Sequence, residues 1–571
     1  MIYSIRDVIS TNDVGDINLT DRDFVSEGGE GRVYRKGDFA YKIYHKPARA
    51  IPIAKARELT SLEAARPAVM YPLRAIYNKH NELVGYVYYF VDGAVALCKI
   101  FTNDYIGRMG INTGNILTMA TEMATTICAV HSRDILIVDG NEFNYLFNEA
   151  NRRVYFIDVD SYQTRNFPAT AIMPSIRDWH TKGFNEGSDW FSFAVVSFQM
   201  FTGIHPYKGT HPKFARNDIE GRMKANASVF DKGVSLPKTM RPISGIPTSW
   251  AQWYRAVLKE GKRVAPPAKP GTYIIPTIVI QKVVGTLLMI EELAEFDSPA
   301  LFISEYGDVI TELYINRGLV RGPQISYTND KVVVSKNNVN ETILVGKRNA
   351  NDCPLTISNG LESVAHSFRA DDITTSNGVV LVKYKTKLME LVFDKVGKKN
   401  IASVGMSWDV LEHATTLYNG VVYQNVLGMP YILITYKKNG QTASLYRQLP
   451  ELRDYRIVSM KQEKKVLQII GFLNGRYDLW TFVFPFDYST PVSWVKEDVG
   501  GNYDINSTVL DNGILVSMNE NGDIEITNTN KAPKSGRVIN DPAVDSTFRL
   551  HSNGCTVLAI SGKKVYKLSV K

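Results

Sequence analysis

The sequence predicts a multidomain α+β protein in which a mixed helix-and-strand domain precedes an all-β domain. Apolar residues recur at helical spacing in the first half of the chain, most clearly in 115–131 and 188–203. Prolines then cluster in Val264–Gly271, a composition that stops helices and stiffens linkers. Beyond that segment the chain reads as strands separated by polar turns, several of which contain Asn-Gly.

Length and composition are those of an ordinary soluble protein with room for two or more cores: 571 residues, 44% hydrophobic and 22% charged. The formal net charge of +8 is uneven, because 201–270 holds 13 Lys and Arg against 4 Asp and Glu. A basic region attracts nucleic acid, acidic protein or lipid headgroups, so a nucleic-acid partner stays open. No arginine-rich run with interleaved aromatic residues strengthens that hypothesis.

The cysteines and the apolar tracts indicate a cytoplasmic protein with no membrane segment. The four cysteines form no CxxC pair, which argues against zinc ribbons and disulfide scaffolds: Cys98, Cys128, Cys353 and Cys555. The first residues lack the basic and apolar regions of a signal peptide. The longest apolar tract, Ile274–Ile290, contains Pro276 and Lys282, so we expect strands there rather than a membrane span.

A glycine-rich hairpin is predicted within 24–44, where strand-like residues flank Gly28, Gly29 and Gly31. Glycines at such a turn let backbone N–H groups approach phosphates closely, because no Cβ intervenes. Lys42 lies on the next strand and supplies a point charge for the same phosphates. Glycine also makes plain turns, so this motif carries weight only together with other motifs.

Helices and strands then follow in a mixed order. The segment 51–66 is predicted as a helix with Leu59 and Leu62 on one face and Glu58 available beside them. The remaining predictions are a strand at 84–91, a long helix at 115–131, a very apolar and buried helix at 188–203, and helices at 212–225 and 248–260.

Two apolar runs, Ile135–Val138 and Val154–Ile157, each end in an aspartate, Asp139 and Asp158. Such runs are typical of short buried strands that deliver an acid where they end. Asn144 lies five positions after the first aspartate. An acid, an amide and a second acid on adjacent loops could form a catalytic base and a two-ligand Mg²⁺ site. The alternative is a solvated acidic hairpin.

These motifs together resemble the eukaryotic-type protein kinase fold over residues 20–265, and the wording is nearest to bacterial Ser/Thr kinases found beside helix-hairpin-helix DNA-binding segments. No such DNA-binding segment is evident in this chain. The resemblance rests on Ser26–Val33, Ala40–Lys42, Ile137–Asp139, Ile157–Asp160 and Ser188–Val195. It implies a bilobal kinase-like domain in which Asp189 braces the backbone of the catalytic loop.

The resemblance also implies ATP and Mg²⁺ as cofactors and a protein substrate. Roles carry over by position: Gly28, Gly29, Gly31 and Val33 would cover the nucleotide, Lys42, held by Glu58, would contact the phosphates, Asn144 and Asp158 would bind Mg²⁺, and Asp139 would be the catalytic base.

Several positions depart from the family pattern. Val138 replaces the arginine that meets an activation-loop phosphate, Asn141 replaces a lysine, and Asp160 replaces a mobile glycine. No clear Ala-Pro-Glu motif lies between Pro174 and His180. A pseudokinase scaffold, a small-molecule phosphotransferase and a nucleic-acid-associated kinase are therefore alternatives. We favour an active Ser/Thr protein kinase, because every group that the chemistry needs is present.

The prolines place the domain boundaries at 1–263, a linker at 264–272 and an all-β domain at 273–571. In that last domain a unit of apolar run, polar turn and second run recurs at intervals of 31 to 48 residues. It starts near Leu301, Val332, Val379, Val421, Val466, Ile514 and Val557. This period predicts a six- or seven-bladed β-propeller, with seven preferred and a pair of β-sandwiches as the alternative. We expect the propeller to recruit a substrate or a protein partner.

Overall fold

A computed structural model describes residues 1–215, 217–267, 287–316, 331–347, 354–359, 367–397, 399–438, 441–499, 504–529, 536–544 and 547–570, and the single positions 322, 324 and 364. The described residues form two compact units. The first unit takes in 1–236 and 240–267, and the second takes in 237–239 and the residues from 287 onward. The predicted linker is described only as far as Pro267. Most of Ile274–Ile290, and Cys353, lie outside the described residues.

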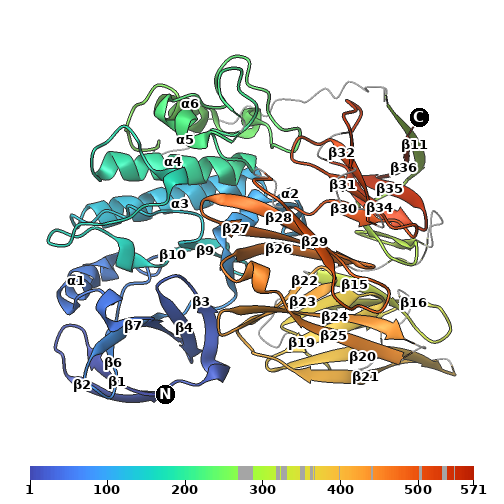
Figure 1. The fold of residues 1–571 in the computed structure, drawn as a ribbon, viewed down its shortest axis with the longest axis horizontal. Coiled ribbons are helices and arrows are strands. Elements are labelled where there is room, and N and C mark those ends of the chain that lie inside the picture. Colours follow the sequence, from blue (N-terminus) through green and yellow to red (C-terminus); the bar gives the residue numbers. More distant parts are fainter. Residues whose placement is uncertain are drawn as a thin grey trace. The chain divides into compact units, whose positions relative to one another are not determined.

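An antiparallel sheet with strand order β2-β1-β6-β7-β5-β4-β3 opens the first unit and is drawn in blue in Figure 1. Its strands are β1 (Ile2–Asp7), β2 (Asp13–Asn18), β3 (Phe24–Glu27), β4 (Gly31–Lys36), β5 (Phe39–Tyr44), β6 (Arg74–Tyr77) and β7 (Leu83–Tyr89). The hairpin predicted within 24–44 is confirmed as β3 and β4, and Lys42 lies on the next strand, β5.

The helix predicted at 51–66 is shorter than expected. The chain forms α1 (Ile53–Leu59) and then tightens into the 3₁₀ helix η3 (Thr60–Ala65). The buried positions of α1 are Lys55, Ala56 and Leu59, so a lysine is part of the face that packs inward.

Helices dominate the rest of the first unit. The predicted long helix is α3 (Thr113–His131), which begins at a capping box made by Asn112 and Asn115. The predicted apolar helix is α4 (Glu186–Thr202), in which every residue from Ser188 to Thr202 is buried. It packs against α3 and α6 (Thr248–Leu258). Only α5 (Ile219–Lys224) of the segment 212–225 is helical, and α2 (Asn103–Arg108) was not predicted.

A hairpin of β9 (Tyr145–Asn148) and β10 (Arg153–Phe156) lies between Asn144 and Asp158, the amide and the second acid singled out in the sequence. The strand predicted at Val154–Ile157 is present, but the one predicted at Ile135–Val138 is wrong, since that run forms only an isolated bridge between Leu136 and Gln163. The reason is local hydrogen bonding. The N–H groups of Ile137 and Val138 donate to a side chain, that of Asp189, and not to a neighbouring strand.

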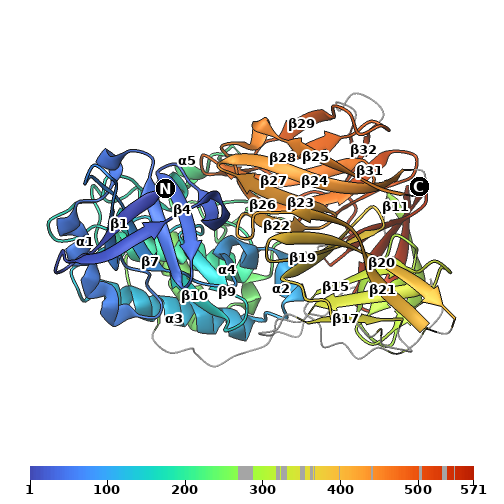
Figure 2. The same ribbon diagram turned by 90° about the horizontal axis from the view of Figure 1, so that it is seen from below.

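Among the described residues, the second unit contains seven separate antiparallel sheets. Two sheets have three strands each: β12 (Ala300–Ile303), β13 (Val309–Thr311) and β14 (Ile315–Asn316) form one, and β15 (Lys331–Lys336), β16 (Thr342–Lys347) and β17 (Leu355–Ser358) form the other. Four sheets have four consecutive strands each: β18 (Asp372–Ser376), β19 (Val379–Tyr384), β20 (Lys387–Val396) and β21 (Lys399–Asp409); β22 (Thr415–Tyr418), β23 (Val421–Val426), β24 (Met429–Lys438) and β25 (Gln441–Gln448); β26 (Arg456–Glu463), β27 (Val466–Leu473), β28 (Arg476–Val483) and β29 (Val492–Lys496); and β30 (Ser507–Val509), β31 (Ile514–Met518), β32 (Ile524–Asn528) and β33 (Arg537–Ile539). The last sheet joins β34 (Arg549–Asn553), β35 (Thr556–Ser561) and β36 (Lys564–Val570) to β11 (Leu288–Glu295), which comes much earlier in the chain. Figure 2 gives a second view of them.

The seven unit starts predicted from the sequence fall in seven different sheets. Two of the predicted Asn-Gly pairs form two-residue hairpin turns, Asn377-Gly378 between β18 and β19 and Asn419-Gly420 between β22 and β23. Both residues of the first turn have positive φ, at 46° and 79°, which is why this dipeptide suits the turn.

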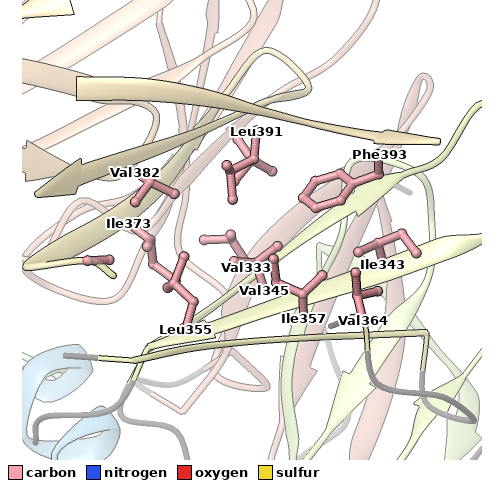
Figure 3. Packing of buried hydrophobic residues seen from close by; sticks show 12 residues of the cluster. Val333, Ile343, Val345, Leu355, Ile357, Val364, Ile373, Val382, Leu391 and Phe393 are labelled. Carbon is pink, nitrogen blue, oxygen red and sulfur yellow. The ribbon is translucent and has the colours of Figure 1, made fainter. Parts of the chain in front are cut away.

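Neighbouring sheets of the second unit pack through apolar side chains. One cluster joins the sheet of β15–β17 to the sheet of β18–β21, as Figure 3 shows. Val345 and Ile357 come from the first of these sheets, and Val382, Leu391 and Phe393 come from the second. The core therefore lies between sheets, face to face, as in layered β architectures.

No helix within the described ranges is both long enough and apolar enough to cross a membrane.

Candidate functional site

Lys42 is the centre of a charged cluster in the first unit. Its neighbours across the sheet are Val33 on β4 and Tyr86 on β7. The Lys42 Nζ atom lies 2.5 Å from Asp158 Oδ1 and 2.8 Å from Asp160 Oδ2, and its side chain is only 13% exposed. Burial by itself would lower the pKa of Lys42, but the two aspartates outweigh it and raise the pKa.

Asp160 is the most enclosed acid of this cluster, with a side chain that is 5% exposed. Besides Lys42, its carboxylate accepts hydrogen bonds from the hydroxyl of Tyr88, at 2.6 Å, and from the hydroxyl of Tyr44. Burial would raise the pKa of Asp160, but Lys42 and these hydrogen bonds lower it. Its carboxyl group is therefore held in the charged form.

The predicted ion pair between Lys42 and Glu58 is not what the structure contains. The Glu58 carboxylate instead accepts a hydrogen bond of 2.7 Å from Asn166 Nδ2. The physical reason is the orientation of α1, whose buried face carries Lys55 and Leu59 while Glu58 lies beside it. Lys55 Nζ donates to the backbone carbonyl oxygen of Asp160 at 2.6 Å.

Asp189 braces the loop that carries Asp139, as expected. Its two carboxylate oxygens accept from the backbone N–H groups of Ile137, at 2.8 Å, and of Val138, at 2.9 Å. His131 Nε2 lies 2.9 Å from the same carboxylate. Val138 has a φ of 62°, which is unfavourable for a β-branched residue, so these bonds hold the backbone in a strained conformation.

Asp139 and Asn144 are adjacent in space. The amide nitrogen of Asn144 donates to the Asp139 backbone oxygen at 2.8 Å and lies 3.4 Å from Asp139 Oδ2. The other carboxylate oxygen of Asp139 accepts from the backbone N–H of Met173 at 2.9 Å. The carboxylate of Asp139 is thus placed by its own loop and by the segment that follows Asp158.

The β9–β10 hairpin brings Asp158 beside Asn144. The backbone N–H of Ile157 donates to the Asn144 carbonyl oxygen at 2.9 Å. Asp158 is the next residue and therefore lies close to Asn144, just past the end of the hairpin. Asp158 has left-handed φ and ψ of 58° and 40°. In the described part of the chain there is no group of three or more His, Cys, Asp and Glu suited to a metal ion. An amide oxygen and one carboxylate do fit Mg²⁺, which takes its remaining ligands from water and phosphates.

The three glycines of the β3–β4 turn differ in their surroundings. A Cβ on Gly31 would lie 2.9 Å from Tyr44 Cα and still closer to the Ile43 carbonyl oxygen, so the neighbouring strand requires glycine there. Gly28 and Gly29 border open space, where a Cβ would meet no atom within 4 Å. At Gly28 and Gly29, therefore, neighbouring atoms do not require glycine.

One ion pair of the first unit was missed from the sequence. Arg263 binds Asp178 through two nitrogens, at 2.6 and 2.7 Å, and the Asp178 side chain is fully buried. Burial would raise the pKa of Asp178, but the hydrogen bonds from Arg263 lower it overall. The only signal in the sequence was a lone acid in the segment where no Ala-Pro-Glu motif could be found.

Much of the basic charge in 201–270 has partners inside the fold. Arg222 is fully buried and donates to the Ala227 carbonyl oxygen at 2.9 Å. Arg241 donates to backbone oxygens at the end of α4, including Met200 at 2.8 Å. With Arg263 bound to Asp178, at least three of these cations serve folding rather than a nucleic-acid surface.

The first unit thus brings together a lysine on an antiparallel sheet with two acids and an amide on a braced loop and a hairpin. Among solved structures, the kinase of Cydia pomonella granulovirus is similar at 14% identity, with a TM-score of 0.32, over 41% of this chain and 85% of that one. This likeness is too distant to carry any role across. Comparison with family models and with curated proteins gave no match.

Proposed function

We propose that the first unit is an ATP- and Mg²⁺-dependent protein kinase that phosphorylates serine or threonine hydroxyls. The observation that carries this proposal is the meeting of Lys42 and Asp158, 116 positions apart in the sequence and 2.5 Å apart at their charged atoms. Phosphoryl transfer depends mainly on positioning and on stabilising negative charge. A lysine beside an acid suited to a metal, near a second acid on a braced loop, meets both needs.

Each side chain has a distinct task in this reaction. Lys42 binds phosphate oxygens as a point charge, and the backbone of 28–29 covers the same phosphates. Asn144 and Asp158 would hold Mg²⁺, which neutralises charge on the phosphates when bound. Asp139 orients the substrate hydroxyl and accepts its proton.

We further propose that the second unit is a closed seven-bladed β-propeller that recruits the substrate or a protein partner. Contacts between one edge strand of each sheet and an edge strand of the next support a ring: β15 with β18, β18 with β22, β22 with β26, β30 with β34, and β34 with β12. Side chains bridge the two remaining neighbours. Thr342 donates to Asp308 at 2.7 Å, and Ser507 donates to Gln468 at 2.6 Å. Loops on such a rigid ring commonly carry binding.

A pseudokinase scaffold is the second candidate, and one contact favours it. The backbone N–H of Met173 donates to the Asp139 carboxylate at 2.9 Å, on the group that a substrate hydroxyl must reach. A protein in which this contact persists would hold nucleotide without transferring phosphate.

The test is an assay of the full chain with γ-labelled ATP, Mg²⁺ and generic protein substrates, followed by mapping of the phosphorylated residues. We expect label on serine or threonine with the wild-type chain and none with Lys42→Ala or Asp158→Asn. Nucleotide binding without transfer would select the scaffold. Label found only on small molecules would select a small-molecule phosphotransferase.

A further inference from the structure

We propose that Asp160, and not the helix residue Glu58, is the residue that positions Lys42 toward the phosphates of a bound nucleotide. This inference rests on the proposed kinase function and deepens it. Asp160 is then a positioning residue, since it acts through Lys42 and not on the reacting atoms.

The contacts of Asp160 suit a rigid anchor. Its Oδ2 atom lies 2.8 Å from Lys42 Nζ and accepts from the Tyr44 hydroxyl, while its Oδ1 accepts from the Tyr88 hydroxyl at 2.6 Å. Both oxygens are therefore fixed by donors on β5 and β7. A carboxylate held on both sides keeps one orientation, and so does the ammonium group that it binds.

The helix α1 contributes a cation to this cluster. Lys55 on its buried face donates to the backbone oxygen of Asp160 at 2.6 Å. The acid that binds Lys42, Asp160, thus comes from the turn after β10. The helix α1 supplies Lys55, which binds the backbone of that turn. A glutamate on α1 is not needed to complete the lysine site, and Glu58 is engaged with Asn166 instead.

Two acids beside one lysine allow a division of tasks. If Mg²⁺ were bound, Asp158 would share its charge with the metal, and its hold on Lys42 would weaken. Asp160, whose Oδ2 atom lies 2.8 Å from Lys42 Nζ, would then keep the lysine in place. A third acid, Glu30 on the glycine turn, has its Oε2 atom 3.5 Å from Lys42 Nζ. Its side chain is 62% exposed, so this contact is weak and phosphates can replace it.

The experiment compares Asp160→Asn with Glu58→Gln, two isosteric changes that remove one negative charge each, in the full chain. The first readout needs no nucleotide: the rate at which an amine-acylating reagent modifies Lys42, followed by peptide mass spectrometry. Loss of Asp160 should speed this modification about tenfold, because the charge-assisted contact at 2.8 Å that fixes and shields the Lys42 amine is lost. Glu58→Gln should change it by less than about twofold.

The second readout is the steady-state kinetics with ATP. Asp160→Asn should raise KM for ATP and lower kcat together, by about tenfold or more in kcat/KM, because a misplaced lysine stabilises bound and reacting phosphates less well. Glu58→Gln should leave both constants within about twofold of wild type. The reverse pattern, with loss in Glu58→Gln and wild-type behaviour in Asp160→Asn, would overturn the proposal.

Two milder variants keep the test decisive if Asp160→Asn does not fold. Tyr88→Phe removes one hydrogen bond from Asp160, and Lys55→Met removes the hold on its backbone; each should speed Lys42 modification by an intermediate amount. Wild-type modification rates in both would refute the anchor. A chain that never transfers phosphate would refute the proposed function alone, since the modification rates still report on the pairing of Lys42 with Asp160.

Discussion

Asp189 holds the backbone of Ile137 and Val138, and the size of this effect can be tested by a single substitution. Asp189→Asn keeps the size of the side chain but replaces one acceptor oxygen by an NH₂ group. One of the two N–H groups that it holds, on Ile137 or Val138, then faces a donor. A buried N–H left without an acceptor costs about 1–3 kcal/mol. The strain of the backbone at Val138, with φ of 62°, is present in wild type and variant alike and adds nothing to this difference.

The expected loss of about 1–3 kcal/mol is measurable by amide hydrogen exchange with mass spectrometry. Peptides that contain 137–138 should lose protection by at least about fivefold, since 1.4 kcal/mol is a factor of ten. Glu186→Gln is the matched control, because this carboxylate lies on the same helix, is 64% exposed and lies 3.9 Å from His131. Equal protection in wild type and Asp189→Asn would refute the view that Asp189 holds the loop.

Three further predictions follow from contacts described above. Asp139→Asn should leave Mg²⁺-dependent ATP binding near wild type but cut turnover by about 10²-fold or more. Asp158→Asn should instead make nucleotide binding weak and insensitive to Mg²⁺. Wild-type ATP binding and turnover in both variants would contradict the roles assigned to these two acids. Gly31→Ala should destabilise the β3–β4 hairpin by about 1–3 kcal/mol, because its Cβ would lie 2.9 Å from Tyr44 Cα, whereas Gly28→Ala, in open space, should be nearly neutral in thermal unfolding. Arg263→Ala should cost about 3–5 kcal/mol at pH 7, because it removes the arginine from the buried Asp178 carboxylate, which keeps the backbone N–H of His180 at 3.0 Å. The pKa of Asp178 is lowered in the folded state, so the pair stabilises the fold above the ordinary pKa of 3.8. This stabilisation is lost as the pH falls through the folded pKa. The difference in the free energy of unfolding between wild type and variant, measured in urea, should therefore shrink below about pH 4.

Elements whose signals are local were predictable from the sequence. The hairpin turns at Asn377-Gly378 and Asn419-Gly420 follow from the φ angles that this dipeptide adopts without strain. The helix α3 follows from apolar spacing. The strands β1 and β2 were missed because β2 is almost wholly exposed and so lacks an alternating pattern.

Pairings between distant residues could not be read from spacing. The resemblance pairs Lys42 with Glu58, whereas Asp158 and Asp160 both contact this lysine in the structure, because the partner depends on how the segment after β10 and α1 pack. The run Ile135–Val138 reads as a strand until Asp189, more than fifty positions later, supplies the acceptors for its backbone. The Arg263–Asp178 pair is hidden for the same reason.

The pairing of β11 with β36 has a consequence for synthesis on the ribosome. Leu288 pairs with Val570, so the first described strand of the second unit cannot pair until the last described strand has been synthesised. At about 5–20 residues per second, that wait is on the order of 15–60 s. During this time the edge of β11 presents unpaired backbone groups to any other nascent chain. Expression at lower chain density, or with chaperones that shield strand edges, should therefore favour a correctly assembled second unit.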